Sequence, residues 1–315
     1  MVRIVSDSST MYSSQQAKDA GFAIAPLSVT IAGKTYKELD EIQLDEFVHI
    51  IGQGHMPTSS QPALGDVIAM YEACGDEEVI NISMADGLSG TYSTAVAAVQ
   101  NVENDKITVV NTGTLCGPHR YMVEVATKMA HAGATKQEIL NKLHALMETD
   151  LSFLIPSDFD YLRRGGRLSP LVSLVGKTIK LAPVLTQSKD GRQLVISTVS
   201  RSFKLAIKHV AKELSSWGVE KGWRIYVVHS AAPGLAEIAH ALLTEAFPET
   251  TLEILPLTPV FTTQGGPGCV AVQVCSPRYC LEGAEESFTG STRTSFTPCQ
   301  GPRGTGGWSP RQSTF

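Results

Sequence analysis

Short β-type runs alternate with helical patterns along most of the chain, and this alternation restricts the fold more than any other feature of the sequence. Apolar residues have strand spacing at 3–6, 23–31, 78–83 and 106–111. They have helical spacing between these runs, at 13–20, 44–51, 91–102, 116–131 and 136–149. Such alternation favours a largely parallel sheet with helices on its faces, so we predict an α/β fold.

The pattern changes near residue 150. A short apolar strand is expected at 151–155, and Asp190-Gly191 between two β-type runs predicts a hairpin over 185–198. Helices are expected at 202–215 and 235–246, and strands at 223–229, 252–255 and on both sides of 265–268. We therefore predict an N-terminal α/β domain at 1–149 and a C-terminal α/β domain at 150–276.

The last segment, 277–315, contains one Leu and no Ile, Val or Met. It cannot bury enough apolar surface to offset its ordering entropy, so we expect a disordered or artefactual tail.

Charge and composition exclude several classes of protein. The net charge is -5 and no basic run is present, which argues against nucleic-acid binding. No apolar stretch approaches the roughly 20 residues that span a bilayer, and the N-terminus lacks a signal-peptide core, so we expect a cytoplasmic protein. The six cysteines form no Cys-x-x-Cys pair, so their spacing suggests neither zinc nor a redox dithiol. We expect no metal site and no cofactor.

Five polar loops, each after an expected strand or before an expected helix, are the candidate sites: 6–10, 57–62, 85–92, 161–169 and 262–268. Ligand sites in α/β proteins gather at the carboxyl ends of strands. Each loop also has a purely structural interpretation, as a capped turn, a solvated helix end or a tight turn between strands.

The second loop is the most informative. Thr58, Ser59 and Ser60 lie between two prolines that restrict the backbone, and hydroxyls donate hydrogen bonds to carboxylates. Capping of a helix from Ala63 would use Ser60 or Gln61 and would leave the other two hydroxyls unexplained. The third loop opens a helix, where exposed amides attract anions, and the fourth carries three arginines that suit a phosphate or an acidic partner.

Taken together and in this order, the loops resemble the DegV family over about residues 1 to 275. The matching segments are Asp7-Ser8-Ser9, Pro57 to Pro62, Leu88-Ser89-Gly90-Thr91-Tyr92, Tyr161 to Arg167 and Gly266-Pro267-Gly268. The resemblance implies two α/β domains with one long-chain fatty acid, such as palmitate, between them. Its carboxylate would be held by Thr58, Ser59 and Ser60, with Asp86, Ser89 and Gln264 at the same site.

Some members of this family, the FakB proteins, present the fatty acid to a separate fatty acid kinase that makes acyl-phosphate. The resemblance then implies a lipid carrier that is not itself an enzyme, with Arg167 and Arg201 facing the partner. The sequence departs from the family at Ala85-Asp86, where Ser-Ser is frequent, and at Gln264, where His is frequent. A carboxylate at Asp86 would repel a bound carboxylate unless one is protonated or Asp86 turns away.

Two other functions receive no support from motifs. A serine-dependent hydrolase or acyltransferase acting on a small acyl substrate is the alternative, but the sequence lacks a Gly-x-Ser-x-Gly elbow. A phosphotransfer enzyme would need a phosphate-binding Gly-x-x-x-x-Gly-Lys-Ser/Thr loop, which is also missing.

Overall fold

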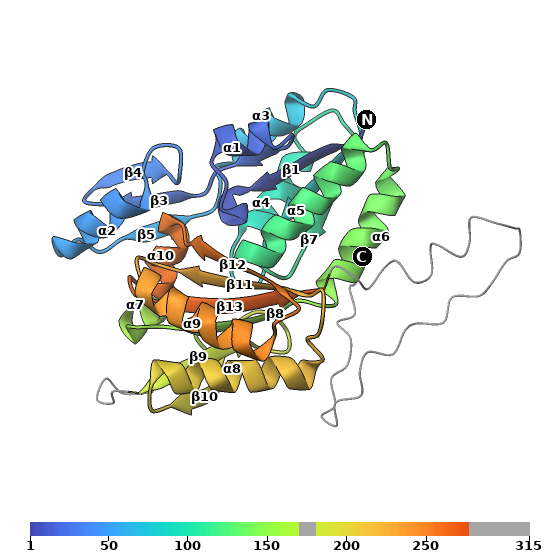
Figure 1. Ribbon diagram of the computed structural model, residues 1–315. Coiled ribbons are helices and arrows are strands. Elements are labelled where there is room, and N and C mark those ends of the chain that lie inside the picture. Colours follow the sequence, from blue (N-terminus) through green and yellow to red (C-terminus); the bar gives the residue numbers. More distant parts are fainter. Residues whose placement is uncertain (170–180, 277–315) are drawn as a thin grey trace, which may run out of the picture.

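The computed structural model describes residues 1–169 and 181–276, so the expected tail at 277–315 lies outside the described residues. The described strands form three sheets, and helices cover both faces of the four-stranded sheet and one face of the six-stranded sheet (Figure 1). The prediction of an α/β fold is confirmed.

A parallel sheet forms the core of the N-terminal half. Its order is β2 (Ala23–Ala25), β1 (Arg3–Asp7), β6 (Val79–Ser83) and β7 (Ile107–Asn111). All three pairings are parallel, as the alternation predicts. One face packs against α1 (Ser14–Asp19), α5 (Cys116–His131) and α6 (Lys136–Met147), and the other against α3 (Leu64–Glu72) and α4 (Thr91–Val99).

A small antiparallel sheet extends from this half. Its order is β4 (Lys34–Lys37), β3 (Ser28–Ile31) and β5 (Thr58–Ser60), and α2 (Leu44–Gly52) follows β4 in the chain. The single strand expected over 23–31 is wrong, because Pro26, which has no N–H to donate, separates β2 from β3. The loop expected at 57–62 is also wrong in part: its hydroxyl residues form β5, with Ser59 opposite Val29.

The C-terminal half contains a six-stranded sheet. Its order is β10 (Leu194–Ser200), β9 (Ala182–Gln187), β8 (Leu151–Ile155), β13 (Val270–Cys275), β11 (Arg224–His229) and β12 (Thr251–Pro256). Only β11 and β12 pair in parallel; the other pairings, including the expected hairpin, are antiparallel. Strand β13, the last in the chain, runs antiparallel between β8 and β11 in the middle of the sheet rather than at an edge.

Side chains along the central strands alternate between the two faces of this sheet. Val270, Val272 and Val274 pack in the cluster that includes α8 (Phe203–Trp217) and α9 (Pro233–Ala246). Ala271 and Gln273 lie on the opposite face, toward the parallel sheet. Because successive side chains of a strand point to opposite faces of its sheet, β13 contributes both to the core under α8 and α9 and to the face toward the parallel sheet.

Three short helices complete the described fold: η1 (Ser8–Thr10), α7 (Phe159–Gly165) and α10 (Pro259–Gly265). The strand expected just before 265–268 is wrong, because that segment forms α10. Pro259 occupies the first turn of α10, where a missing N–H costs nothing. The helix expected from Ala63 begins at Leu64, and no side chain caps it.

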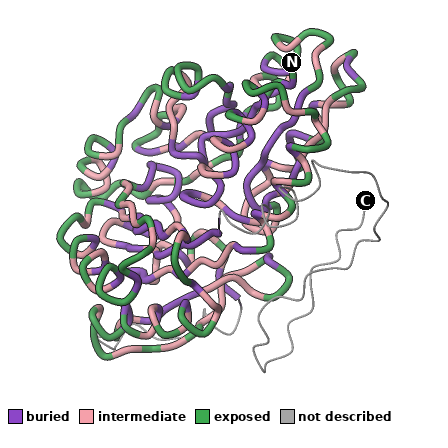
Figure 2. Tube along the Cα trace, turned by 45° about the vertical axis from the view of Figure 1, so that its right-hand side comes forward, coloured by how far each residue is buried: buried purple, intermediate pink, exposed green. Residues whose placement is uncertain are grey.

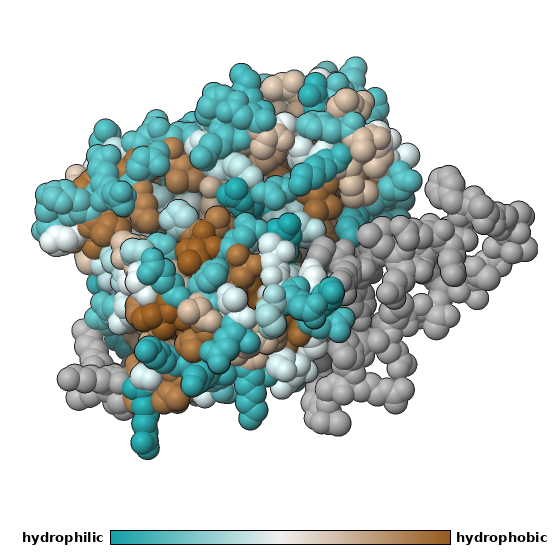
Figure 3. Space-filling view, in the orientation of Figure 1, coloured by the Kyte–Doolittle hydropathy of each residue, from teal (hydrophilic) through white to brown (hydrophobic). Residues whose placement is uncertain are grey.

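Buried segments run through the middle of both halves, while exposed segments lie on the outer helices and turns (Figure 2). On the face drawn in Figure 3, hydrophobic residues form separate groups among hydrophilic ones. None of the helices in the described ranges is both long and apolar enough to cross a membrane.

The two halves make close contact where α5 begins. A Cβ atom at Gly117 would lie 2.3 Å from Cγ of the Tyr226 ring in β11, so only glycine fits.

We expect Gly117→Ala to lower the free energy of unfolding by about 1–3 kcal/mol through overpacking, measured by urea denaturation. Gly65→Ala is the control. It meets nothing within 4 Å and should stabilise α3 by about 0.5–1 kcal/mol. Equal effects of the two substitutions would contradict this interpretation of the contact.

Candidate functional site

A cavity of about 400 Å³ lies between the parallel sheet and the six-stranded sheet. The segments that follow β6 and β7 form one side, and β8, β9 and β13 form the opposite side. Strand β5 and helix α10 border it as well. This volume falls within the roughly 300–1,000 Å³ that is typical of small-molecule sites.

Most of the cavity wall is apolar. Its larger apolar side chains include Leu88, Leu115, Leu154, Leu162, Leu185 and Phe261. Two thiols, those of Cys116 and Cys269, are fully buried in the same wall, and burial raises the pKa of the Cys269 thiol to about 12. Such a wall favours an apolar ligand, because each methylene that leaves water gains about 0.8 kcal/mol.

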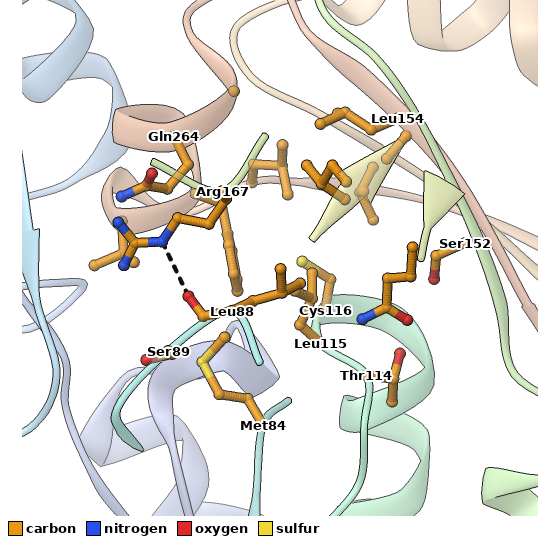
Figure 4. A pocket seen from close by; sticks show the side chains of 18 of the residues that line it. Met84, Leu88, Ser89, Thr114, Leu115, Cys116, Ser152, Leu154, Arg167 and Gln264 are labelled. Carbon is orange, nitrogen blue, oxygen red and sulfur yellow. Dashed lines mark hydrogen bonds between the residues drawn. The ribbon is translucent and has the colours of Figure 1, made fainter. Parts of the chain in front are cut away.

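One end of the cavity carries a positive charge. Arg167 lies in the wall, and its Nε donates a hydrogen bond to the Leu88 carbonyl oxygen at 3.0 Å (Figure 4). A second bond from its guanidinium reaches the Gly165 carbonyl oxygen. No carboxylate among the described residues pairs with Arg167, and burial alone lowers its pKa. We call this region, formed by Arg167, Ser59, Ser60, Ser89 and Gln264, the arginine end.

Gln264 and Ser59 form a hydrogen-bonded pair at the arginine end. The Gln264 Nε2 atom donates to Ser59 Oγ at 2.8 Å, so the hydroxyl proton of Ser59 stays free to donate to a ligand. Space for the Gln264 amide comes from Gly165, where a Cβ atom would lie 2.0 Å from Gln264 Oε1. The predicted residues Ser59, Ser60, Ser89 and Gln264 thus meet in one place, although far apart in the sequence.

The N-terminus of α4 adds to the positive potential there. Ser89 Oγ accepts a hydrogen bond from the Thr91 amide at 3.3 Å, and Gly90 lies beside it in the cavity wall. The Gln61 side chain donates to Thr94 Oγ1 at 2.6 Å, which attaches the segment after β5 to this helix. A helix N-terminus carries about half a positive charge, so an anion is favoured next to it.

Two of the predicted contact residues lie outside the cavity wall. Thr58 is exposed in β5 and does not line the cavity. Asp86 is exposed too, and its Oδ2 lies 3.8 Å from Arg192 Nη2. The Asp86 side chain thus points toward Arg192 and away from the cavity, so it would not lie beside a carboxylate bound there.

The arginines expected to face a partner lie in different places. Arg167 is half-buried in the cavity wall, which the sequence reasoning did not anticipate. Arg201 is exposed in the turn between β10 and α8, outside the cavity.

Sequence reasoning also missed a second polar group in the wall, on the side away from the arginine end. It consists of Thr114, Ser152, Thr186, Gln187 and Gln273. Gln273 was a usable signal, because it is the only strongly polar residue of β13 and is 1% exposed. Its amide donates to the Leu115 carbonyl oxygen and to Ser152 Oγ, both at 3.0 Å.

The first polar loop has a structural role. Asp7 accepts hydrogen bonds from the Ser9 and Met84 amides, at 2.9 and 3.1 Å. Ser8 Oγ donates to Glu38 Oε1 at 2.5 Å and accepts from the Leu27 amide. Glu38 in turn accepts from the Val260 amide of α10, so this network joins the parallel sheet to the helix that borders the cavity.

Glu38 makes the stability of the protein depend on pH. Burial raises its pKa to about 7 from an ordinary value of 4.5, against hydrogen bonds that lower it. Between pH 4.5 and 7 the folded protein keeps a proton that the unfolded chain releases, so stability falls as pH rises through this window. The free energy of unfolding of Glu38→Gln should not fall in this way. We therefore expect the difference in unfolding free energy between this variant and wild type to grow by about 3 kcal/mol, in favour of the variant, from pH 4.5 to pH 7. Urea denaturation at several pH values measures this difference, and parallel pH profiles would refute it.

The family model and the similar proteins all point to the same family. The family model described as an uncharacterised protein, DegV family, matches residues 1–276. A DegV domain-containing protein of Staphylococcus aureus is 30% identical over 274 residues, which cover 86% of this chain and 97% of that protein. A DegV domain-containing protein of Listeria monocytogenes is 29% identical over 276 residues, with the same coverage.

Solved structures agree with the sequence matches. A structure described as fatty acid binding of a DegV family protein from Thermus thermophilus has a TM-score of 0.79 and 25% identity, and covers 87% of this chain and 99% of that one. DegV of Bacillus subtilis, described as a fatty acid binding protein, has a TM-score of 0.77 and 25% identity, with the same coverage.

Proposed function

Because the chain belongs to the DegV family, we propose that it binds one long-chain fatty acid in the cavity, with the carboxylate at the arginine end. The single observation that carries this proposal is Arg167, the one charged side chain in the described part of a mostly apolar wall, with no acidic partner among the described residues. A half-buried unpaired cation is costly, and an anionic head group relieves that cost. Ser59, Ser89 and the N-terminus of α4 supply further donors.

The apolar wall accounts for the acyl chain. A chain of about 16 carbons gains roughly 0.8 kcal/mol for each methylene buried, so its burial supplies most of the affinity. The head group then fixes the direction in which the chain enters. The proposal requires no cofactor.

We also propose that the protein presents its fatty acid to a separate fatty acid kinase in the cytoplasm. Ser60 is exposed and also lines the cavity, so the arginine end reaches the molecular surface. A partner enzyme would find the carboxylate there, and the exposed Arg201 is available for contact with it.

Nothing in the cavity favours the alternative of a hydrolase or acyltransferase. Its described wall contains no His, Asp or Glu, so no side chain there can serve as a general base for a serine. His119 does contact Ser6 at 3.0 Å, but both are buried and the Ser6 hydroxyl donates to the Ile82 carbonyl oxygen.

Native mass spectrometry of the purified protein tests the proposal. We expect a mass increase of one fatty acid per chain, which disappears after delipidation and returns when palmitate is added. Solvent extraction followed by chromatography identifies the acid. A protein that carries no lipid and takes up neither palmitate nor oleate would rule the proposal out.

A further inference from the structure

The polar group on the far side of the cavity is unexpected in a site for a simple acyl chain. Thr114, Ser152, Thr186, Gln187 and Gln273 would face the distal part of the chain if the carboxylate binds at the arginine end. Figure 4 shows Thr114 and Ser152 on the opposite side of the cavity from Arg167 and Gln264, with apolar side chains between. Methylenes gain nothing from contact with such groups.

Thr114 carries a hydroxyl that has no partner within residues 1–169 and 181–276. The residue is 1% exposed, and its Oγ1 makes no hydrogen bond to any residue in these ranges. Its backbone is held in place, because the carbonyl oxygen accepts a hydrogen bond from the Ala85 amide at 2.9 Å. A buried polar group left unpaired costs free energy, and such groups are rare in folded proteins.

Ser152 offers a free proton near the same place. Its Oγ accepts a hydrogen bond from Gln273 Nε2 at 3.0 Å, which fixes the oxygen and leaves the hydroxyl proton without an acceptor among the described residues. Gln273 is itself held by the Gly117 amide, which donates to its Oε1 at 3.2 Å. The structure therefore holds two hydroxyls in the wall of the cavity, each able to donate to a ligand oxygen.

We propose that the preferred ligand is a fatty acid whose acyl chain carries a hydroxyl or carbonyl oxygen far from the carboxylate, and that Thr114 and Ser152 bind this oxygen. The inference rests on the proposed function, because the acid must enter with its carboxylate at the arginine end. It adds a class of ligand: an oxygenated rather than an unsubstituted acyl chain.

Competition binding to the delipidated protein tests this preference. The probes are palmitate with ω-hydroxypalmitate, and stearate with a mid-chain hydroxystearate. We expect wild type to bind at least one hydroxylated acid about tenfold more tightly than its parent, the factor that one added hydrogen bond gives. Equal affinities in both pairs would overturn the inference and leave the proposed function intact. Failure of all four acids to bind would contradict both this inference and the proposed function.

Thr114→Val separates hydrogen bonding from shape, because it replaces the hydroxyl by a methyl group of similar size. We expect the hydroxylated acid to lose most of its advantage over its parent, because one of the two donating hydroxyls is gone. Thr127→Val is the matched control: Thr127 is buried in α5, outside the cavity wall, and its hydroxyl donates to the Val123 carbonyl oxygen. This variant should keep the wild-type preference. A preference that survives in Thr114→Val would show that this hydroxyl does not bind the ligand oxygen.

Discussion

Arg167→Met is expected to weaken palmitate binding by ten- to a hundredfold. A hydrogen bond to a charged group contributes about 1.5–3 kcal/mol, and Arg167 is the cation that lines the described cavity wall. Met keeps most of the apolar volume of the side chain, so the loss of palmitate affinity measures what the positive charge contributes. Titration calorimetry with delipidated protein measures the affinity.

Arg201→Met provides the control for this experiment. Arg201 is exposed and lies outside the cavity wall, so its replacement should leave palmitate affinity unchanged. If both variants bind palmitate like wild type, the carboxylate does not contact Arg167. If a fatty acid kinase is available, reduced acyl-phosphate formation by Arg201→Met with normal lipid binding would support the proposed partner contact.

Filling the cavity should abolish binding without unfolding the chain. Ala271 lies in β13, opposite Leu154 of β8 and Val228 of β11, and all three side chains line the cavity. A phenyl ring at this position occupies the space of several methylenes, each of which contributes about 0.8 kcal/mol. We expect Ala271→Phe to reduce palmitate affinity at least a hundredfold.

Stability provides the necessary check on Ala271→Phe. Its melting temperature should equal or exceed that of delipidated wild type, because the added ring enters open space rather than a packed core. Val199→Phe is the control, since Val199 is 47% exposed in β10. It should bind palmitate normally. A stable Ala271→Phe protein that binds palmitate like wild type would place the acyl chain elsewhere.

Local features of the sequence predicted local structure well. The helix over Cys116–His131 was expected at the same residues, and Thr135 caps the next helix with Glu138, as its position before Lys136 indicates. The parallel pairing of β1, β6 and β7 followed from strand–helix alternation. These elements depend on spacing and capping within a few residues, which a single sequence contains.

Contacts between residues far apart in the sequence were harder to predict. The antiparallel position of β13 depends on how the chain returns between β8 and β11, and no local pattern encodes it. The direction of Asp86 depends on Arg192, 106 positions later in the chain. The polar group around Thr114 comes from four separate segments, so only Gln273, a polar residue within an apolar strand, pointed to it.

A crystal structure of the protein with bound palmitate tests the central claim most directly. The account predicts one acyl chain in the cavity between the two sheets, with its carboxylate within hydrogen-bonding distance of Arg167 and Ser59 and its methyl end toward Thr114. A carboxylate beside Thr114 and Ser152, or a palmitate bound outside the cavity, would contradict it.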